Sequence, residues 1–233
     1  MRISAVAAFF VLAVSGSAAG QTTVGIYDPA SKPKTVVMSM TERGVFLSMV
    51  LPAVRRSIRP ELCEELIDEA GVIRGSFTRR DAKETLVFYQ YCQTGNGFGW
   101  AGIAIIEGER IVGNWIAEAG WTVDVRLVPD IDGDGLDEVV LVYSGGMHQG
   151  SGGSGADILH FAGGKPVPFG WYKASEFAPS GPTAIWKLTA RAGTAPAFYR
   201  QQFTSRDEKR WKAVGKPMLF KLAKTRTEYK SAK

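Results

Sequence analysis

The sequence has few side chains that could supply nitrogen or sulfur to a metal ion. Its 233 residues contain two histidines, His148 and His160, and two cysteines, Cys63 and Cys92. These residues do not follow the spacing of zinc sites, and the sequence contains neither a Walker phosphate loop nor a dinucleotide-binding fingerprint. These absences argue against the common zinc-dependent and nucleotide-dependent classes of protein.

Long apolar runs are also missing, apart from one near the first residue. Ile3 to Val14 is apolar except for Ser4, it follows Arg2, and it leads into small residues that end at Ala19. This pattern is typical of a secretory signal, and the run is too short for a stable membrane anchor. We expect residues 1–20 to be a signal peptide and the mature protein to be secreted or periplasmic, without a membrane span.

The composition is ordinary for a globular protein, with 45% hydrophobic and 22% charged residues, but the charge is uneven. From Arg206 to Lys233 there are ten basic residues and three acidic ones. One interpretation is an anionic partner, such as a cell-envelope polymer or lipid headgroups. The interpretation that we favour is a solvated edge strand followed by a frayed basic tail. We expect that the protein does not bind nucleic acid and that it is a monomer.

The two cysteines, Cys63 and Cys92, are predicted to form one disulfide. An isolated pair in an oxidising compartment is most simply explained in this way. Closing a loop of this length would stabilise the fold by roughly 3 kcal/mol in the chain-entropy model. The alternative is a reactive thiol, which needs a nearby base, and neither histidine is close in sequence.

One helical segment precedes a series of strands. Residues 42–58 show apolar side chains at helical spacing after a possible cap at Thr41, with a kink or break at Pro52. Glu61 to Ala70 is interpreted as a short helical turn that Gly71 ends. Strands are then predicted at residues 85–91, 100–107, 110–117, 123–127, 139–143, 158–161, 167–172, 184–189, 197–203 and 218–222.

This order predicts a mainly β fold, a β-rich α+β protein with antiparallel sheets built from hairpins. We expect an extended arm over residues 21–40, a single β-rich domain over 41–222 with its helical segment at 42–58, and a basic tail over 223–233. The continuous apolar run at 139–143 favours a central strand. The six tryptophans are interpreted as packing residues, although they could also line a sugar-binding groove.

The glycine-rich stretch Ser144 to Gly155 is interpreted as a flexible loop. It holds serines and His148, so nucleophilic chemistry is an alternative, but no Gly-x-Ser-x-Gly elbow is present. His160 alternates with apolar neighbours in a strand, which favours a surface or packed residue over a metal ligand. Carboxylate pairs for glycoside hydrolysis could be present among the other acids.

The segment Asp130 to Glu138 concentrates five carboxylates in nine residues. Ionised carboxylates this close repel one another, and a hard cation would relieve the repulsion. The spacing fits calcium, with side-chain oxygens at positions one, three and five, a backbone carbonyl at seven and a carboxylate at nine. These positions are Asp130, Asp132, Asp134, Leu136 and Glu138. The alternative is a solvated turn in which the aspartates bond their own backbone.

With its apolar continuation through Leu141, this segment resembles the calcium loops of FG-GAP or VCBS-type repeats. Asp130, Asp132, Asp134, Gly135 and Glu138 match that pattern. The resemblance covers about thirty residues, and it implies a structural Ca²⁺ between strands of a propeller-like blade in a secreted or surface scaffold. An EF-hand is disfavoured, because position twelve is Leu141 and the flanking segments have strand patterns.

The sequence therefore predicts an exported, non-enzymatic Ca²⁺-binding protein. We expect a binding or scaffold module of the periplasm or cell surface, whose partner is an unidentified protein or a cell-envelope polymer. The alternative hypothesis is a secreted hydrolase that acts on a polymer such as a polysaccharide.

Overall fold

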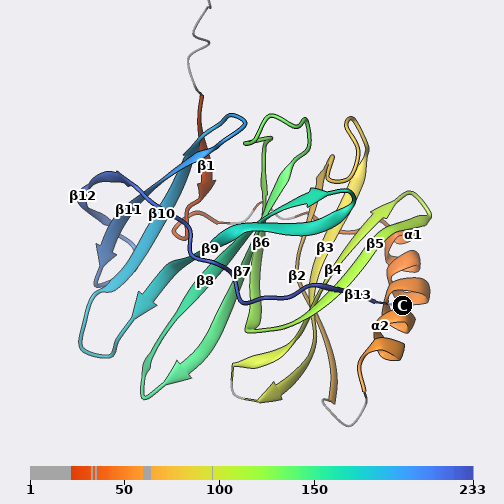
Figure 1. The fold of residues 1–233 in the computed structure, drawn as a ribbon. Helices are drawn as coiled ribbons and strands as arrows, with labels where there is room; N and C mark the ends of the chain where they lie inside the picture. Colours follow the sequence, from red (N-terminus) through yellow and green to blue (C-terminus); the bar gives the residue numbers. More distant parts are fainter. Residues whose placement is uncertain (1–21, 33, 35, 60–63, 96, 233) are drawn as a thin grey trace, which may run out of the picture.

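A computed structural model describes residues 22–232 except 33, 35, 60–63 and 96. The predicted signal peptide, residues 1–20, lies outside the described residues. Two antiparallel sheets and one helical segment make up the fold, which confirms the mainly β fold class (Figure 1). None of the helices in the described part of the chain combines the length and hydrophobicity that a membrane crossing requires.

The larger sheet has eight strands and the smaller sheet has five. The larger sheet runs in the order β12-β11-β10-β9-β8-β7-β6, with β1 paired to β10, and the smaller sheet runs β13-β5-β4-β3-β2. The strands are β1 Thr23–Tyr27, β2 Glu64–Gly75, β3 Glu84–Gly95, β4 Phe98–Glu107, β5 Arg110–Ala119, β6 Trp121–Val128, β7 Glu138–His148, β8 Ser151–Ala162, β9 Lys165–Phe177, β10 Thr183–Arg191, β11 Ala197–Ser205, β12 Lys212–Leu219 and β13 Lys230–Ser231. Most neighbours in each sheet are sequential hairpins, as the strand spacing predicts.

The described residues form three apolar cores. The first lies between the helical segment and the smaller sheet, and the second lies between the two sheets. The third covers the other face of the larger sheet. Strand β7 contributes Val139 and Leu141 to the second core and Val140 and Val142 to the third, so its continuous apolar run is buried on both faces. Trp115 is buried between the sheets, as expected for a packing residue.

The helical segment consists of α1 (Met40–Val45), the π-helical turn η1 (Phe46–Val50) and α2 (Leu51–Ser57). Pro52 stands in the first turn of α2, where its missing N–H is tolerated, and the helix is irregular just before it. The cap is Ser39 rather than Thr41, so that prediction was wrong. Ser39 and Glu42 form a capping box, in which each side chain accepts a hydrogen bond from the other's backbone N–H.

The helical turn predicted at Glu61–Ala70 is also wrong. Residues 64–70 belong to β2, which pairs along the edge of β3. Their sequence is rich in helix-forming residues, but pairing with the buried strand β3 determines the local structure. At Gly71 a Cβ atom would lie 2.8 Å from Cγ1 of Val125, so the absence of a side chain lets β2 approach β6 closely.

The glycine-rich stretch Ser144–Gly155 is a β-hairpin rather than a flexible loop. Strands β7 and β8 stay paired up to His148 and Ser151, and Gln149 and Gly150 form the turn. The glycines permit close packing, because a Cβ on Gly153 would lie 2.3 Å from the carbonyl oxygen of Ser175 on β9. The prediction of a flexible loop was wrong because the glycines are needed for close approach between strands, not for flexibility.

The two predicted tails are integrated into the sheets. Strand β1 pairs with β10, and Ile26 is buried in the third core, so this part of the predicted extended arm belongs to the larger sheet. The C-terminal segment crosses from the larger to the smaller sheet (Figure 1). Ala223 exchanges two backbone hydrogen bonds with Trp171, and β13 pairs with β5. The expectation of a frayed tail is therefore wrong for residues up to 232.

Cys92 lies in β3, is fully buried and is disulfide-bonded. Cys63 lies outside the described residues, so the pairing of Cys63 with Cys92 stays a prediction.

Candidate metal centre

The acidic loop joins β6 to β7 at one end of the larger sheet. Strands flank it on both sides, as the sequence predicts and unlike an EF-hand. Ile131 is fully buried in the third core and anchors the loop, and its carbonyl accepts a 2.8 Å hydrogen bond from the N–H of Gly193. The loop is therefore held by packing before any ion is considered.

Backbone N–H groups fix the three aspartates inside the loop. Asp130 accepts hydrogen bonds from Gly133 at 2.7 Å and from Gly135 at 2.9 Å. One oxygen of Asp132 accepts from the N–H of Asp134 at 3.1 Å, and one oxygen of Asp134 accepts from the N–H of Leu136 at 2.8 Å. These bonds turn the chain so that alternate side chains face the same side.

Gly135 is required at position six. Its φ is +82°, in the left-handed region that favours glycine. A Cβ atom there would also lie 2.5 Å from Nε of Arg80. That Nε donates a 2.7 Å hydrogen bond to the carbonyl of Asp134. The side chain of Arg80, from the turn between β2 and β3, therefore occupies the space beside Gly135.

Four carboxylates converge on one point. Asp130, Asp132, Asp134 and Glu138 each offer an oxygen, and the four oxygens lie within 4.8 Å of one another. Glu138 is fully buried at the start of β7. Its Oε2 accepts a 2.8 Å hydrogen bond from the N–H of Ile131, while its Oε1 is buried and has no hydrogen-bond partner among the described residues. A buried acceptor without a partner costs about 1–3 kcal/mol, and a cation at this position would satisfy the oxygen.

Electrostatics support the same conclusion. Burial raises the pKa of Glu138 to about 8, because the Ile131 N–H only partly offsets it and the charges of Asp132, Asp130 and Asp134 add to it. A cation at the point of convergence would reverse this balance and favour the ionised carboxylate. The residues therefore fit a metal ion, and an all-oxygen ligand set is what hard cations bind.

Leu136 was predicted to offer its carbonyl at position seven. The structure shows its N–H bonded to Asp134, and the role of its carbonyl stays a prediction.

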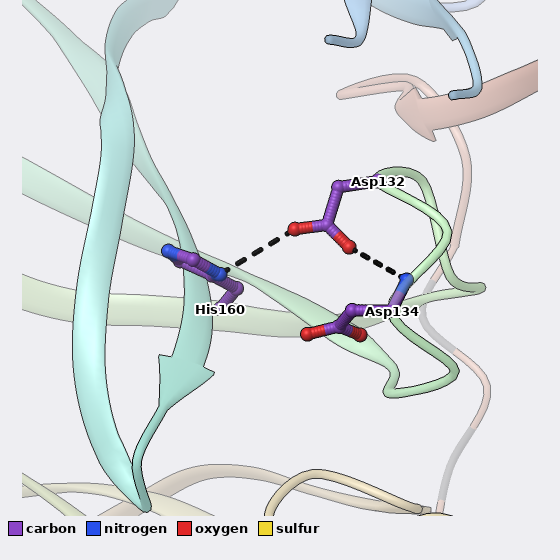
Figure 2. A group of neighbouring side chains, drawn as sticks. All are labelled: Asp132, Asp134 and His160. Atoms are coloured by element: carbon purple, nitrogen blue, oxygen red, sulfur yellow. Dashed lines mark hydrogen bonds and ion pairs between the residues drawn. The ribbon is translucent and has the colours of Figure 1, made fainter. Parts of the chain in front are cut away.

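His160 also lies beside this loop, from β8. Its Nδ1 lies 3.5 Å from Oδ2 of Asp132, and His160, Asp132 and Asp134 offer a second set of ligand atoms within 4.8 Å of one another. Figure 2 shows the imidazole facing both aspartates across a short gap. The sequence interpretation of His160 as an ordinary packed or surface residue missed this contact.

The register of the β7–β8 hairpin could have revealed the contact between His160 and the acidic loop. Val139 pairs with Leu159, so the next residues toward the loop, Glu138 and His160, stand at the same end of the β7–β8 ladder. The local alternation of residues 158–161 does not contain this pairing.

The hydrolase hypothesis drew on the serines and His148 of the β7–β8 hairpin. Among the described residues, no hydrogen bond joins the imidazole of His148 to a serine or a carboxylate. His148 lies at the end of β7 and lines an open groove of about 520 Å³ with Ser151 and Glu176. That geometry lacks the base-to-nucleophile contact of a catalytic triad.

No protein-family model matches this chain, and neither the curated proteins nor the solved structures provide a match. The resemblance to FG-GAP or VCBS-type repeats therefore rests on the residues of the loop alone.

Proposed function

We propose that this protein is an exported Ca²⁺-binding protein that acts as a binding or scaffold module without enzymatic activity. One observation carries the proposal. Three aspartates and a fully buried glutamate converge within 4.8 Å, and within the described part of the chain the Oε1 of Glu138 has no hydrogen-bond partner. Ca²⁺ is the cation that this proposal names, because it takes six to eight oxygen ligands at about 2.3–2.6 Å in flexible geometry, and the four carboxylates of this loop supply part of that set.

The structural role of the ion follows from what the loop contacts. The carbonyl of Ile131 accepts a hydrogen bond from Gly193, which lies in the loop between β10 and β11. The carbonyl of Asp134 accepts one from Arg80, which lies in the turn between β2 and β3. One bound ion would hold together three segments that are distant in sequence. The proposed Ca²⁺ therefore stabilises a rigid exported scaffold, which could present a surface to a protein or a cell-envelope polymer.

Titration calorimetry with CaCl₂ and MgCl₂ tests this proposal on the untagged protein. The informative variant is Glu138→Gln, which removes the charge of the buried ligand. Asp137→Asn is the matched control, because it removes one charge from the same loop while its side chain bonds the N–H of Ser76 outside the cluster. We expect the wild type to bind one Ca²⁺, Glu138→Gln to bind it at least about tenfold more weakly, and Asp137→Asn to stay within about threefold of the wild type.

Equal Ca²⁺ binding by the two variants would contradict the proposed site. Absence of Ca²⁺ binding by the folded wild-type protein would reject the proposed function.

A further inference from the structure

The Nδ1 nitrogen of His160, which forms no hydrogen bond among the described residues, adds a nitrogen donor to the oxygen donors of the acidic loop. The Nδ1 atom is buried and accepts or donates no hydrogen bond within the described residues. It lies 3.5 Å from Oδ2 of Asp132, a separation that allows an ion pair when the imidazole is protonated, but the two atoms form no hydrogen bond. The His160 ring is stacked on Phe169 with 4.5 Å between the ring centroids, so packing holds the imidazole in this orientation.

The 3.5 Å separation has a simple explanation if both atoms bind one metal ion. Zinc binds imidazole nitrogen and carboxylate oxygen at about 2.0–2.2 Å, so two ligands of a tetrahedral ion lie about 3.4 Å apart. The separation between Nδ1 of His160 and Oδ2 of Asp132 matches that distance between two ligands. Asp134 completes a group of three within 4.8 Å, and Figure 2 shows both carboxylates on the side of the loop that faces the imidazole.

We propose that His160, Asp132 and Asp134 form a second metal site, which takes a divalent transition metal such as Zn²⁺ in preference to Ca²⁺. Imidazole suits zinc, copper and nickel, whereas calcium takes oxygen ligands. Three protein ligands would leave a coordination position for water. This inference uses the same loop as the proposed function, but it depends on His160 where the Ca²⁺ site depends on Glu138.

The two sites cannot be filled independently. One oxygen of Asp132 already accepts from the N–H of Asp134, and one oxygen of Asp134 accepts from the N–H of Leu136. Asp132 and Asp134 belong to both ligand sets, so an ion in one site uses carboxylates that the other site needs. Zn²⁺ and Ca²⁺ then compete, and the loop responds to the relative amounts of the two ions.

The test uses Zn²⁺ titration of the untagged protein at neutral pH, with and without excess Ca²⁺. His160→Gln is the informative variant and His148→Gln is the control, because His148 lies at the exposed tip of the same hairpin. We expect His160→Gln to weaken Zn²⁺ binding at least about tenfold and to leave Ca²⁺ binding within about twofold. Glu138→Gln should show the opposite pattern, with weakened Ca²⁺ binding and retained Zn²⁺ binding. Excess Ca²⁺ should weaken Zn²⁺ binding to the wild type.

A spectroscopic measurement keeps the inference testable if His160→Gln does not fold. His148→Gln retains His160 as its only histidine. Pulsed EPR of this variant with one Cu²⁺ bound should show the nitrogen coupling of a coordinated imidazole. Absence of that coupling, unchanged Zn²⁺ affinity in folded His160→Gln, or Zn²⁺ binding unaffected by excess Ca²⁺ in a protein shown to bind Ca²⁺ would overturn the inference. Each of these results leaves the Ca²⁺ site to be judged separately by Glu138→Gln.

Discussion

Ser76 and Asp137 bond each other twice. The N–H of Ser76 donates to Oδ2 of Asp137 at 2.8 Å, and the N–H of Asp137 donates to the carbonyl of Ser76 at 2.8 Å. Ser76 follows β2 of the smaller sheet and Asp137 precedes β7 of the larger one. The acidic loop is thereby fastened to both sheets, so a change within the loop is expected to reach residues that bind no ion.

The first prediction concerns hydrogen exchange at these contacts. Removing Ca²⁺ with a chelator should leave the loop carboxylates unneutralised and loosen the bonds that hold the loop. We expect faster amide exchange at Ser76, Asp137 and Gly193 in the chelated protein than in the Ca²⁺-loaded protein. Exchange at Phe88, within the buried strand β3, should change little. Identical exchange at all four amides with and without Ca²⁺ would contradict a bracing role for the ion.

A second prediction concerns the glycine-rich hairpin. Gly153→Ala places a methyl group 2.3 Å from the backbone oxygen of Ser175, and backbone on a paired strand cannot easily move aside. We expect a loss of about 1–3 kcal/mol in the free energy of unfolding, measured by denaturant titration. Gly145→Ala on the same hairpin is the control, because nothing lies within 4 Å of its added methyl group. Equal stability of the two variants would mean that the segment is not packed in solution.

The third prediction concerns the C-terminal segment. The hydroxyl of Tyr229 lies 2.7 Å from that of Tyr143 and donates a 3.3 Å hydrogen bond to the buried carboxylate of Asp157. Tyr229→Phe leaves these buried groups with fewer partners, so the protein should lose about 1–3 kcal/mol of unfolding free energy. Substitution of the exposed neighbour, Glu228→Gln, should have little effect. A stable Tyr229→Phe variant would indicate that the segment does not dock on the larger sheet.

A fourth prediction follows from the pKa of Glu42. Burial alone would raise this pKa, but hydrogen bonds from Thr85, Ser39 and Arg74 outweigh it and lower the pKa from 4.5 to about 2. The folded protein therefore keeps the negative charge at lower pH than the unfolded chain does. The resulting stabilisation is complete above about pH 4.5 and is lost as the pH falls through about 2.

Melting temperatures across that pH range test the prediction. Glu42→Gln should melt below the wild type at neutral pH, and the difference should shrink as the pH falls from 4.5 toward 2. Glu109→Gln, in the exposed turn between β4 and β5, serves as a control for the loss of one acidic charge. A difference between Glu42→Gln and the wild type that is constant with pH would contradict the prediction.

Much of the sheet structure could be predicted from local sequence. Gly108-Glu109 between two apolar runs indicated the β4–β5 hairpin, and the run from Val139 to Tyr143 indicated a strand buried on both faces. These signals work because alternation and turn residues act within a few positions. The convergence of the loop carboxylates was also predictable, since each aspartate bonds a backbone N–H two to five residues ahead.

The features that were missed depend on contacts between distant residues. Residues 64–70 have a helical composition and become a strand because β3 is beside them. Gly153 looks flexible until Ser175 is placed next to it, and His160 looks ordinary until Asp132 is placed across from it. In each case the deciding partner lies about twenty or more residues away, where local propensity carries no information.

The most direct measurement is a crystal structure of the protein grown with CaCl₂, with anomalous differences collected to locate the ion. The proposed function predicts one anomalous peak among Asp130, Asp132, Asp134 and Glu138, with Oε1 of Glu138 about 2.3–2.6 Å from it. A map without a peak at that position, or one in which Oε1 of Glu138 faces a water molecule or another protein group, would contradict it.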